Sequence, residues 1–194
     1  MKKLKVVVID NYDSFTYNLV HILDELEVEV TIIRNNQFHI DDLEAYDKIL
    51  ISPGPGIPSE AGLTKKVIKT YAAKKPILGI CLGHQSIGQS YGGSIVQCKE
   101  IMHGKIDMIE HSGHELFKGV NKNFKATRYH SLIVERETLP PNLKIIAETR
   151  NKIIMGIAHK NKNIFGLQFH PESIGTIVGK TILKNFLSII KYEY

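Results

Sequence analysis

The chain has 194 residues, of which 43% are hydrophobic and 23% are charged, an ordinary balance for a globular protein with a substantial core. Its net charge of +5 would suit a nucleic-acid partner, but the lysines are scattered and lack the interleaved aromatic residues of a single-strand binder. Length and charge pattern therefore predict one domain, residues 1–194, that does not bind nucleic acid.

The two cysteines, Cys81 and Cys98, exclude a disulfide framework and a CxxC metal pair. Such cysteine usage fits a reducing, cytoplasmic setting. The first apolar run stops at Asp10, which makes it too short for a signal peptide. No apolar stretch approaches the roughly 20 residues that cross a bilayer, so we expect a cytoplasmic chain that does not engage a membrane.

In the first half of the chain, apolar runs typical of buried strands alternate with helical spacing. Strands are expected at Leu4–Ile9, Val28–Ile33, Ile49–Ser52 and Ile77–Ile80. A helix capped by Asp13 or Ser14 is expected to carry Tyr17, Val20, Leu23 and Leu26, and a second helix to carry Leu63, Val67, Ile68 and Tyr71. This alternation indicates an open, doubly wound sheet with right-handed crossovers.

The second half contains short, β-branched segments separated by polar turns, which favour antiparallel pairs. These strands are expected at Ile106–Ile109, Phe124–Tyr129, Leu132–Glu135, Leu143–Ala147, Ile153–Ala158 and Ile164–Gln168. A last helix is expected over Val178–Ile190. The predicted fold class is α/β and flavodoxin-like: an open, doubly wound, mostly parallel sheet with helices on both faces and an additional small antiparallel sheet. In such folds the site lies at the carboxyl ends of the strands.

Cys81 follows the expected strand Ile77–Ile80 and is bracketed by Gly79 and Gly83. A glycine two residues before and after a nucleophile suits a sharp strand-to-helix turn, because glycine accepts a strained backbone and leaves room for close packing. The N–H groups at the start of the following helix favour the thiolate, the form that attacks. By itself the pattern fits equally well a small, inert cysteine buried in a βα turn.

A nucleophilic cysteine needs a base and a group that orients the base. Among the nine histidines, His170 ends a strand-like run and is followed by Pro171 and Glu172. Strand residues two apart face the same side, so the Glu172 carboxylate can reach the imidazole. Taken separately, a polar strand end with a chance His-Pro-Glu sequence is the simpler interpretation of this segment. His84 is expected to point along its helix, away from the sulfur. The remaining histidines considered are expected to be ordinary surface residues: His21, His39, His111, His114 and His159.

The segment Pro53-Gly54-Pro55-Gly56 follows the third expected strand. Alternating proline and glycine makes a rigid loop with an uncovered backbone. Beside Cys81, the N–H groups of Gly56 and Leu82 would form a two-donor oxyanion hole. A plain turn is the simpler interpretation of this loop when it is taken separately.

Taken in order, these segments resemble the class I (triad) glutamine amidotransferases: Pro53–Gly56, Gly79–Gln85 and Phe169–Ser173. Three further stretches, Asp10–Leu19, Met102–Lys105 and Arg128–Leu132, resemble the small subunit (component II) of anthranilate synthase and aminodeoxychorismate synthase. The resemblance covers essentially the whole chain. Gly56 stands where some relatives have cysteine, a difference of little consequence if the backbone N–H does the work.

The resemblance implies a set of site residues. The catalytic residues are Cys81, His170 and Glu172, the oxyanion donors are Gly56 and Leu82, and the glutamine-binding residues are Gly54, Pro55, Gly56, Gln85, Ser131 and Leu132. His130 is expected either to neighbour that pocket or, as we favour, only to pack. No cofactor is expected in this chain, whereas the partner subunit is expected to use Mg²⁺.

The implied reaction is hydrolysis of L-glutamine to glutamate and ammonia. A chorismate-binding synthase subunit would receive the ammonia and make 4-amino-4-deoxychorismate, anthranilate or both. No phosphate-binding glycine-rich loop appears, which argues against a fused synthetase. Asp10–Ser14 and Met102–Lys105 are candidates for the contact with the partner, although simple loop capping explains them equally well.

Two other functions fit parts of the pattern. Another hydrolase with the same cysteine turn, such as a γ-glutamyl hydrolase or a peptidase, would not need the Pro53–Gly56 loop together with Arg128–Leu132. A non-catalytic flavodoxin-like or receiver module would suit the acidic turn at Asp10 and Asp13, but the third strand ends in Ser52 and Pro53 instead of a phosphorylatable aspartate.

Overall fold

The computed structural model describes residues 3–190. Within these residues the strands form one nine-stranded sheet in the order β2-β1-β3-β4-β9-β8-β7-β5-β6. The strands are β1 Lys5–Asp10, β2 Glu29–Arg34, β3 Lys48–Ile51, β4 Ile77–Ile80, β5 Ile95–His111, β6 Asn123–Val134, β7 Leu143–Thr149, β8 Ile154–His159 and β9 Ile164–Leu167. The helices are α1 Thr16–Glu25, α2 Thr64–Tyr71, α3 Leu82–Ser90 and α4 Gly179–Ser188, with 3₁₀ turns at Ile40–Ala45, Pro58–Glu60 and Glu115–Phe117.

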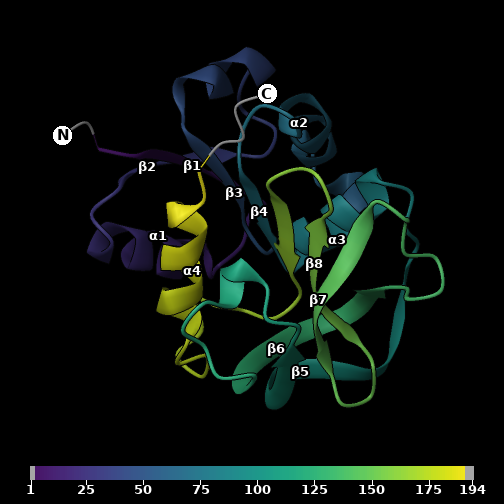
Figure 1. The fold of residues 1–194 in the computed structure, drawn as a ribbon. Helices are drawn as coiled ribbons and strands as arrows, with labels where there is room; N and C mark the ends of the chain where they lie inside the picture. The colour runs from purple at the N-terminus through teal and green to yellow at the C-terminus, as the bar shows by residue number, and fades with distance from the viewer. Residues whose placement is uncertain (1–2, 191–194) are drawn as a thin grey trace.

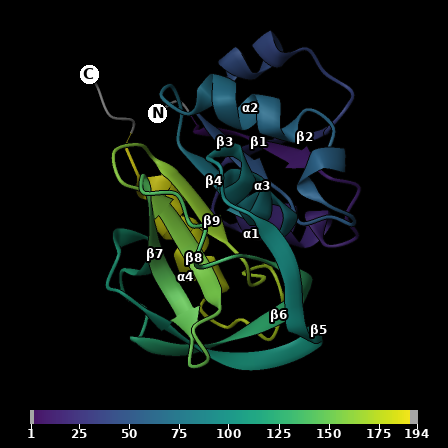
Figure 2. The ribbon, with the colours of Figure 1, turned by 90° about the vertical axis from the view of Figure 1, so that its right-hand side faces the viewer.

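Strands β2, β1, β3, β4 and β9 are parallel, and helices cover both faces of this half (Figure 1, Figure 2). Alternate residues of each strand enter different cores, as the two-residue period of a strand requires. Val6 and Val8 of β1 pack with α1 and α4 on one face. Val7 and Ile9 pack with α2 and α3 on the other. The α/β fold class expected from the sequence is therefore confirmed.

The antiparallel strands differ from the expected separate small sheet, because they continue the parallel sheet through the β9–β8 pair. Figure 2 shows β5 and β6 crossing the lower end of the molecule as a long two-stranded arm. The sequence predicted strand only over Ile106–Ile109 in β5, and two strands where the structure has β6. Register shifts near Met102 and Lys105 and largely exposed β5 residues blur the alternation that marks a strand.

Helix α1 differs from its prediction in both cap and buried face. Its N-cap is Phe15 and makes no side-chain capping bond, although Asp13 or Ser14 was expected there. The buried hydrophobic residues are Leu19 and Leu23, whereas Tyr17 is 66% exposed. Spacings of three drift around a helix at about 100° per residue, so positions 17 and 26 lie on opposite sides. Residues four apart, such as Leu19 and Leu23, stay on nearly the same side of the helix and therefore both face the core.

The carboxyl ends of β1, β3, β4 and β9 meet at one edge of the sheet, where Asp10, Ser52, Cys81 and Gln168 follow or end their strands. Ile80 of β4 and Leu167 of β9 are register partners. The residues that follow them, Cys81 and Gln168, therefore emerge side by side. Within residues 3–190, no helix is long and apolar enough to cross a membrane.

Candidate active site

Cys81 lies in the turn between β4 and α3 with φ 51° and ψ −102°. This conformation is strained for a residue with a side chain, and such strain persists only where the surroundings enforce it. The Cys81 N–H donates to the Leu167 carbonyl at 2.8 Å, which ties the turn to β9. A Cβ atom on Gly79 would lie 2.5 Å from the Gly83 carbonyl oxygen, so both glycines are needed for the helix to start against its own strand.

His170 and Glu172 form a buried pair, with Nδ1 of His170 2.5 Å from Oε1 of Glu172. Burial on its own would lower the pKa of His170. The Cys81 thiol and the Glu172 carboxylate outweigh burial and raise the pKa of His170 to about 10. Glu172 occupies one ring nitrogen, and Nε2 makes no other hydrogen bond of ordinary geometry within the described residues. The structure thus brings together Cys81, His170 and Glu172.

The sulfur of Cys81 has two further neighbours that sequence reasoning did not single out. It lies 3.6 Å from the Tyr129 carbonyl oxygen and 3.6 Å from Nε2 of Gln168. Gln168 is fully buried and follows β9 immediately. Gln168 lies beside Cys81 because β4 pairs with β9, two strands separated by more than 80 residues of chain. No local sequence pattern could therefore predict this contact.

Two aromatic side chains pack on the imidazole of His170. The ring centroids of Tyr129 and His170 are 5.1 Å apart, and those of Phe15 and His170 are 5.7 Å apart, both in edge-on geometry. Phe15 also contacts Tyr129, with centroids 5.1 Å apart. This packing restricts how the imidazole can turn.

A second carboxyl group, that of Asp13, lies near this pair. Burial raises the pKa of Asp13, helped by the negative charges of Glu172 and Asp10, while the Phe15 N–H and His170 oppose the rise. Asp13 therefore lies within electrostatic range of both His170 and Glu172. The Phe15 N–H donates to Oδ2 of Asp13 at 2.9 Å.

The Pro53–Gly56 loop lies against the start of α3. A Cβ atom on Gly54 would be 3.0 Å from Cδ2 of Leu82, which places the loop beside the first residue after Cys81. Gly56 has φ +77°, a backbone conformation that favours glycine. Within the described residues no acceptor takes the Gly56 N–H, and the first N–H groups of a helix such as α3 lack partners within the helix.

The expected glutamine-binding residues lie on either side of the sulfur. Nε2 of Gln85 donates to the Leu132 carbonyl at 3.0 Å and to Oε1 of Gln168 at 3.1 Å. These bonds leave Oε1 of Gln85 without a hydrogen-bond partner in residues 3–190. Ser131 is exposed at the same edge, next to Leu132. The segment Gly54–Gly56 borders the other side of the turn.

His130 is buried and hydrogen-bonded beside these residues, whereas a packing role was favoured from sequence. Its Nδ1 lies 3.1 Å from the Leu132 carbonyl oxygen, and its Nε2 accepts from Nε of Arg128 at 3.0 Å. Burial and the Arg128 charge lower the pKa of His130 to about 3. His130 is therefore neutral and holds the carbonyl that also receives Gln85.

The other histidines that were considered differ in their burial. His84 is fully buried with both ring nitrogens lacking hydrogen bonds of ordinary geometry, and burial lowers its pKa to about 4. It packs on β9, because a Cβ on Gly166 would lie 2.8 Å from its Nδ1. His21 and His39 are exposed, as expected.

The expected surface positions of His111 and His159 are wrong, since both are buried, and His114 is half-buried. Each of the three accepts a backbone N–H two residues further along the chain through its Nδ1. These hydrogen bonds stabilise the turns that contain the histidines. Because each imidazole lies against the backbone to make its bond, it is shielded from solvent. Within the described part of the chain, no group of three His, Cys, Asp or Glu residues could hold a metal ion.

Comparison with known proteins places this arrangement in a family. The sequence matches the family model described as glutamine amidotransferase class-I over residues 7–190. It is 50% identical over 190 residues to the aminodeoxychorismate/anthranilate synthase component 2 of Bacillus subtilis, covering 97% of this chain and 98% of that protein. It is also 50% identical over 189 residues to the bifunctional protein TrpGD of Thermotoga maritima, covering 95% of this chain but only 32% of that longer protein.

A solved structure agrees. A Thermoplasma acidophilum protein described as part of a GMP synthase superposes with a TM-score of 0.87 at 28% identity, covering 96% of this chain and 94% of that one. The strained cysteine turn, the buried His170–Glu172 pair and the match over residues 7–190 point the same way. The chain therefore belongs to the class-I glutamine amidotransferase family and is an enzyme of that family.

Proposed function

We propose that Cys81, His170 and Glu172 hydrolyse the side-chain amide of L-glutamine and that the ammonia passes to a separate chorismate-binding synthase subunit. The observation that carries this proposal is the convergence of the strained Cys81 turn with a histidine whose other nitrogen is held by a buried carboxylate. Family membership supports the substrate, and the names of the relatives support the partner.

In the proposed reaction, the Cys81 sulfur attacks the amide carbon while the imidazolium of His170 retains the thiol proton. The raised pKa of His170 favours this charged pair at neutral pH. The Gly56 and Leu82 N–H groups stabilise the oxyanion of the tetrahedral intermediate. His170 gives its proton to the departing ammonia, leaving a γ-glutamyl thioester on Cys81. It then activates the water that releases glutamate, and Glu172 orients the imidazole throughout.

In the proposed glutamine pocket, Gln85 and the Ser131–Leu132 segment hold the α-amino and carboxylate ends of the substrate. Oε1 of Gln85 has its acceptor capacity free, while its Nε2 is fixed by Leu132 and Gln168. Gly54, Pro55 and Gly56 line the opposite side. We propose no cofactor for this chain and Mg²⁺ for the partner subunit, in a cytoplasmic setting.

The product follows from the partner. The Bacillus subtilis relative is named for both aminodeoxychorismate and anthranilate synthesis. We therefore propose that the ammonia serves 4-amino-4-deoxychorismate, anthranilate or both. Ammonia that escapes into water at neutral pH is protonated and lost as a nucleophile, so the partner must cover the site.

We propose that the partner docks on the face that carries Asp10–Ser14 and Met102–Lys105. The rings of His103 and Phe15 both contact Tyr129, which in turn contacts His170, so the two segments lie on the same side of the site. Ile174 lines the same surface hollow as Phe15 and Tyr129, and Ile177 follows it three residues later in the chain. Ile174 is 100% exposed and Ile177 is 90% exposed, and exposed apolar side chains that cluster are typical of interaction sites.

Replacing Cys81 by serine tests the function directly. We expect Cys81→Ser to abolish ammonia release from glutamine, because a serine hydroxyl is far less readily ionised than a thiol. The complex of this variant with the synthase subunit should still form product when ammonium is added. Glutamine-dependent product formation by the variant would contradict the proposal. Rapid cleavage of γ-glutamyl peptides by the wild type, with free glutamine untouched, would favour the hydrolase alternative.

A further inference from the structure

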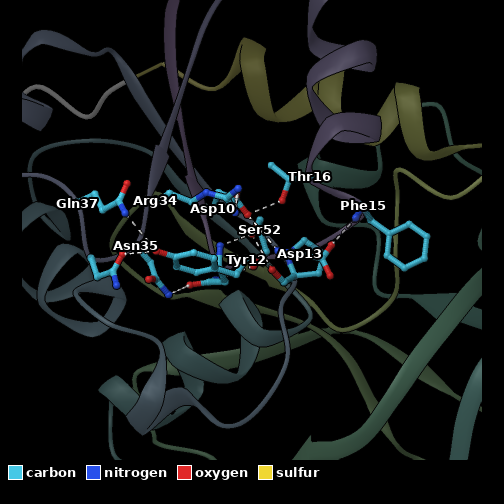
Figure 3. A network of polar contacts seen from close by, with 12 residues as sticks. Asp10, Tyr12, Asp13, Phe15, Thr16, Arg34, Asn35, Gln37 and Ser52 are labelled. Carbon is cyan, nitrogen blue, oxygen red and sulfur yellow. Dashed lines mark hydrogen bonds and ion pairs between the residues drawn. The ribbon is translucent and has the colours of Figure 1, made fainter.

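The turn between β1 and α1, residues 10–16, is held by several hydrogen bonds and an ion pair. Figure 3 shows its side chains beside Arg34, Asn35 and Gln37, which end or follow β2, and Ser52, which follows β3. Oδ1 of Asp10 accepts from Oγ1 of Thr16 at 2.8 Å, and Oδ2 lies 2.7 Å from Nη1 of Arg34. The turn is therefore fixed at its base, although it lies on the exposed edge of the sheet.

Asn11 links this turn to Ser52, which follows β3 and precedes the Pro53–Gly56 loop. Its backbone N–H donates to Oγ of Ser52 at 2.8 Å, and its side-chain Nδ2 donates to the Ser52 carbonyl at 2.9 Å. Its Oδ1 accepts from Nδ2 of Asn35 and from Oγ1 of Thr64, both at 2.9 Å. The amide of Asn11 is buried and uses both its donor and its acceptor, so it joins three separate segments of the chain.

Asn11 also touches the loop itself. A Cβ atom on Gly54 would lie 2.5 Å from Cβ of Asn11 and 2.7 Å from its carbonyl oxygen, while its third neighbour is Leu82. Gly54 is thus packed between Asn11 on one side and the first residue of α3 on the other. The position of the loop relative to Cys81 follows from where Asn11 holds Ser52 and Gly54.

We propose that Asn11 is a positioning residue for the oxyanion hole. It acts through Ser52 and Gly54, fixing the path of the loop that presents the Gly56 N–H. This inference rests on the proposed function, since it assigns Asn11 to the glutaminase step. The bond from Nδ2 of Asn11 to the Ser52 carbonyl is the contact that matters, because it joins the turn to the loop. The bond from Nδ2 of Asn35 to Oδ1 holds the amide in the orientation that makes this contact, and Thr64 adds a second donor to the same oxygen.

The test compares Asn11→Ala and Asn11→Asp with Thr64→Val. The alanine variant removes the whole amide. The aspartate variant keeps the acceptor for Asn35 and Thr64 but cannot donate to Ser52. Thr64→Val removes one bond to Asn11 and leaves the Ser52 contact intact. Misplacing a catalytic group by about 1 Å costs up to roughly 100-fold in rate. We expect kcat for glutamine to fall about 10- to 100-fold in both Asn11 variants, with KM within about twofold of wild type.

Alkylation of Cys81 by iodoacetamide supplies the second readout, because this reaction forms no tetrahedral oxyanion. We expect its rate to stay within about twofold of wild type in both Asn11 variants. Thr64→Val should lower the denaturant midpoint without the loss of kcat. Equal kcat in folded Asn11 variants and wild type would overturn the inference, and so would an equal loss in Thr64→Val. Absence of glutamine hydrolysis in the wild type would instead refute the proposed function.

Discussion

At the scale of single residues, the site depends on a cysteine whose backbone is strained and whose sulfur is approached by separate parts of the chain. The turn supplies the strain, β9 supplies Gln168, and β6 supplies the Tyr129 carbonyl. His170 adds a base whose charge is stabilised by its neighbours despite burial. The pKa of His84 shifts in the opposite direction, because burial is the dominant influence there.

His84 should make stability depend on pH. Its pKa falls from 6.5 unfolded to about 4 folded, so the unfolded chain binds one more proton between these values. The stability that depends on neutral His84 is therefore fully present above about pH 6.5. It is lost progressively as the pH falls towards 4. We expect His84 to account for a loss of about 2 kcal/mol between pH 7 and pH 5.

Urea unfolding of the wild type and of His84→Gln at both pH values measures this loss. The glutamine variant should lose less stability on acidification, whatever its stability at pH 7. His114 and His130, whose pKa values are also lowered, keep part of the slope in both proteins. An identical pH dependence in the two proteins would contradict the assignment to His84.

At the scale of elements, α3 packs so closely on the sheet that only glycine fits at the contacts. Gly79 in β4 touches the Gly83 backbone in α3, and a Cβ on Gly83 would lie 2.8 Å from the Ile51 carbonyl oxygen. Backbone atoms cannot rotate away as a side chain can. The close approach is what directs the start of α3, with its free N–H groups, at the Cys81 sulfur.

Gly79→Ala should therefore damage both stability and catalysis. Its new Cβ would meet backbone at 2.5 Å and push α3 away from β4. We expect a loss of roughly 3 kcal/mol in the free energy of unfolding and a severe loss of kcat. Gly156→Ala in β8 is the matched control, since its contacts begin at 3.1 Å and involve side chains first. It should lose about 1 kcal/mol or less and keep kcat. Similar kcat values in the two variants would argue against this role of Gly79.

At the scale of the whole molecule, one end carries the site and the proposed contact face, and the opposite end carries the amino ends of the parallel strands. The loop after Glu172 is held firmly, because Oγ1 of Thr176 accepts from the Thr127 N–H at 2.9 Å and Gly175 packs on Ile106. Ile174 and Ile177 are therefore presented on a fixed support. At the other end, the Lys48 side chain binds the Ile189 carbonyl, next to the 85% exposed Ile190.

Coupling to the partner gives a prediction at this scale. We expect the isolated chain to be a weak glutaminase that the synthase subunit stimulates, because ammonia released without a partner is wasted. Ile174→Asp should weaken complex formation at least tenfold and lower this stimulation, since it places a charge in an apolar contact. Its thermal stability should match the wild type, because Ile174 is fully exposed.

Ile190→Asp is the control, because it places the same charge at the opposite end of the sheet. Titration calorimetry with the partner subunit, together with glutaminase assays at saturating partner, would compare the two variants. Equal affinity of both variants for the partner would place the docking face elsewhere. Full glutaminase activity of the isolated wild type would remove the reason for coupling.

The parallel half of the fold was predictable from sequence because each strand is a short apolar run flanked by polar turns, and β4 was placed without error. The Cys81 turn and the His170–Glu172 pair were likewise predictable, because each depends on only a few consecutive residues. The β5–β6 arm was not, because its exposed and bulged residues carry little alternation. The face of α1 was missed because spacing by three does not follow a helix of 3.6 residues per turn.

Residues that are adjacent in the chain already specify the local parts of the proposed site: the cysteine between its glycines, the histidine with its carboxylate, and the loop of prolines and glycines. The side chains that surround these parts come from distant segments and are brought there by the fold. Gln168 reaches Cys81 because β4 pairs with β9. Phe15 and Tyr129 reach His170 because the residue that precedes α1 contacts β6. Asn11 reaches Ser52, just before the Pro53–Gly56 loop, because β1 lies beside β3. Local motifs are encoded in adjacent residues, whereas these contacts depend on the order of the strands.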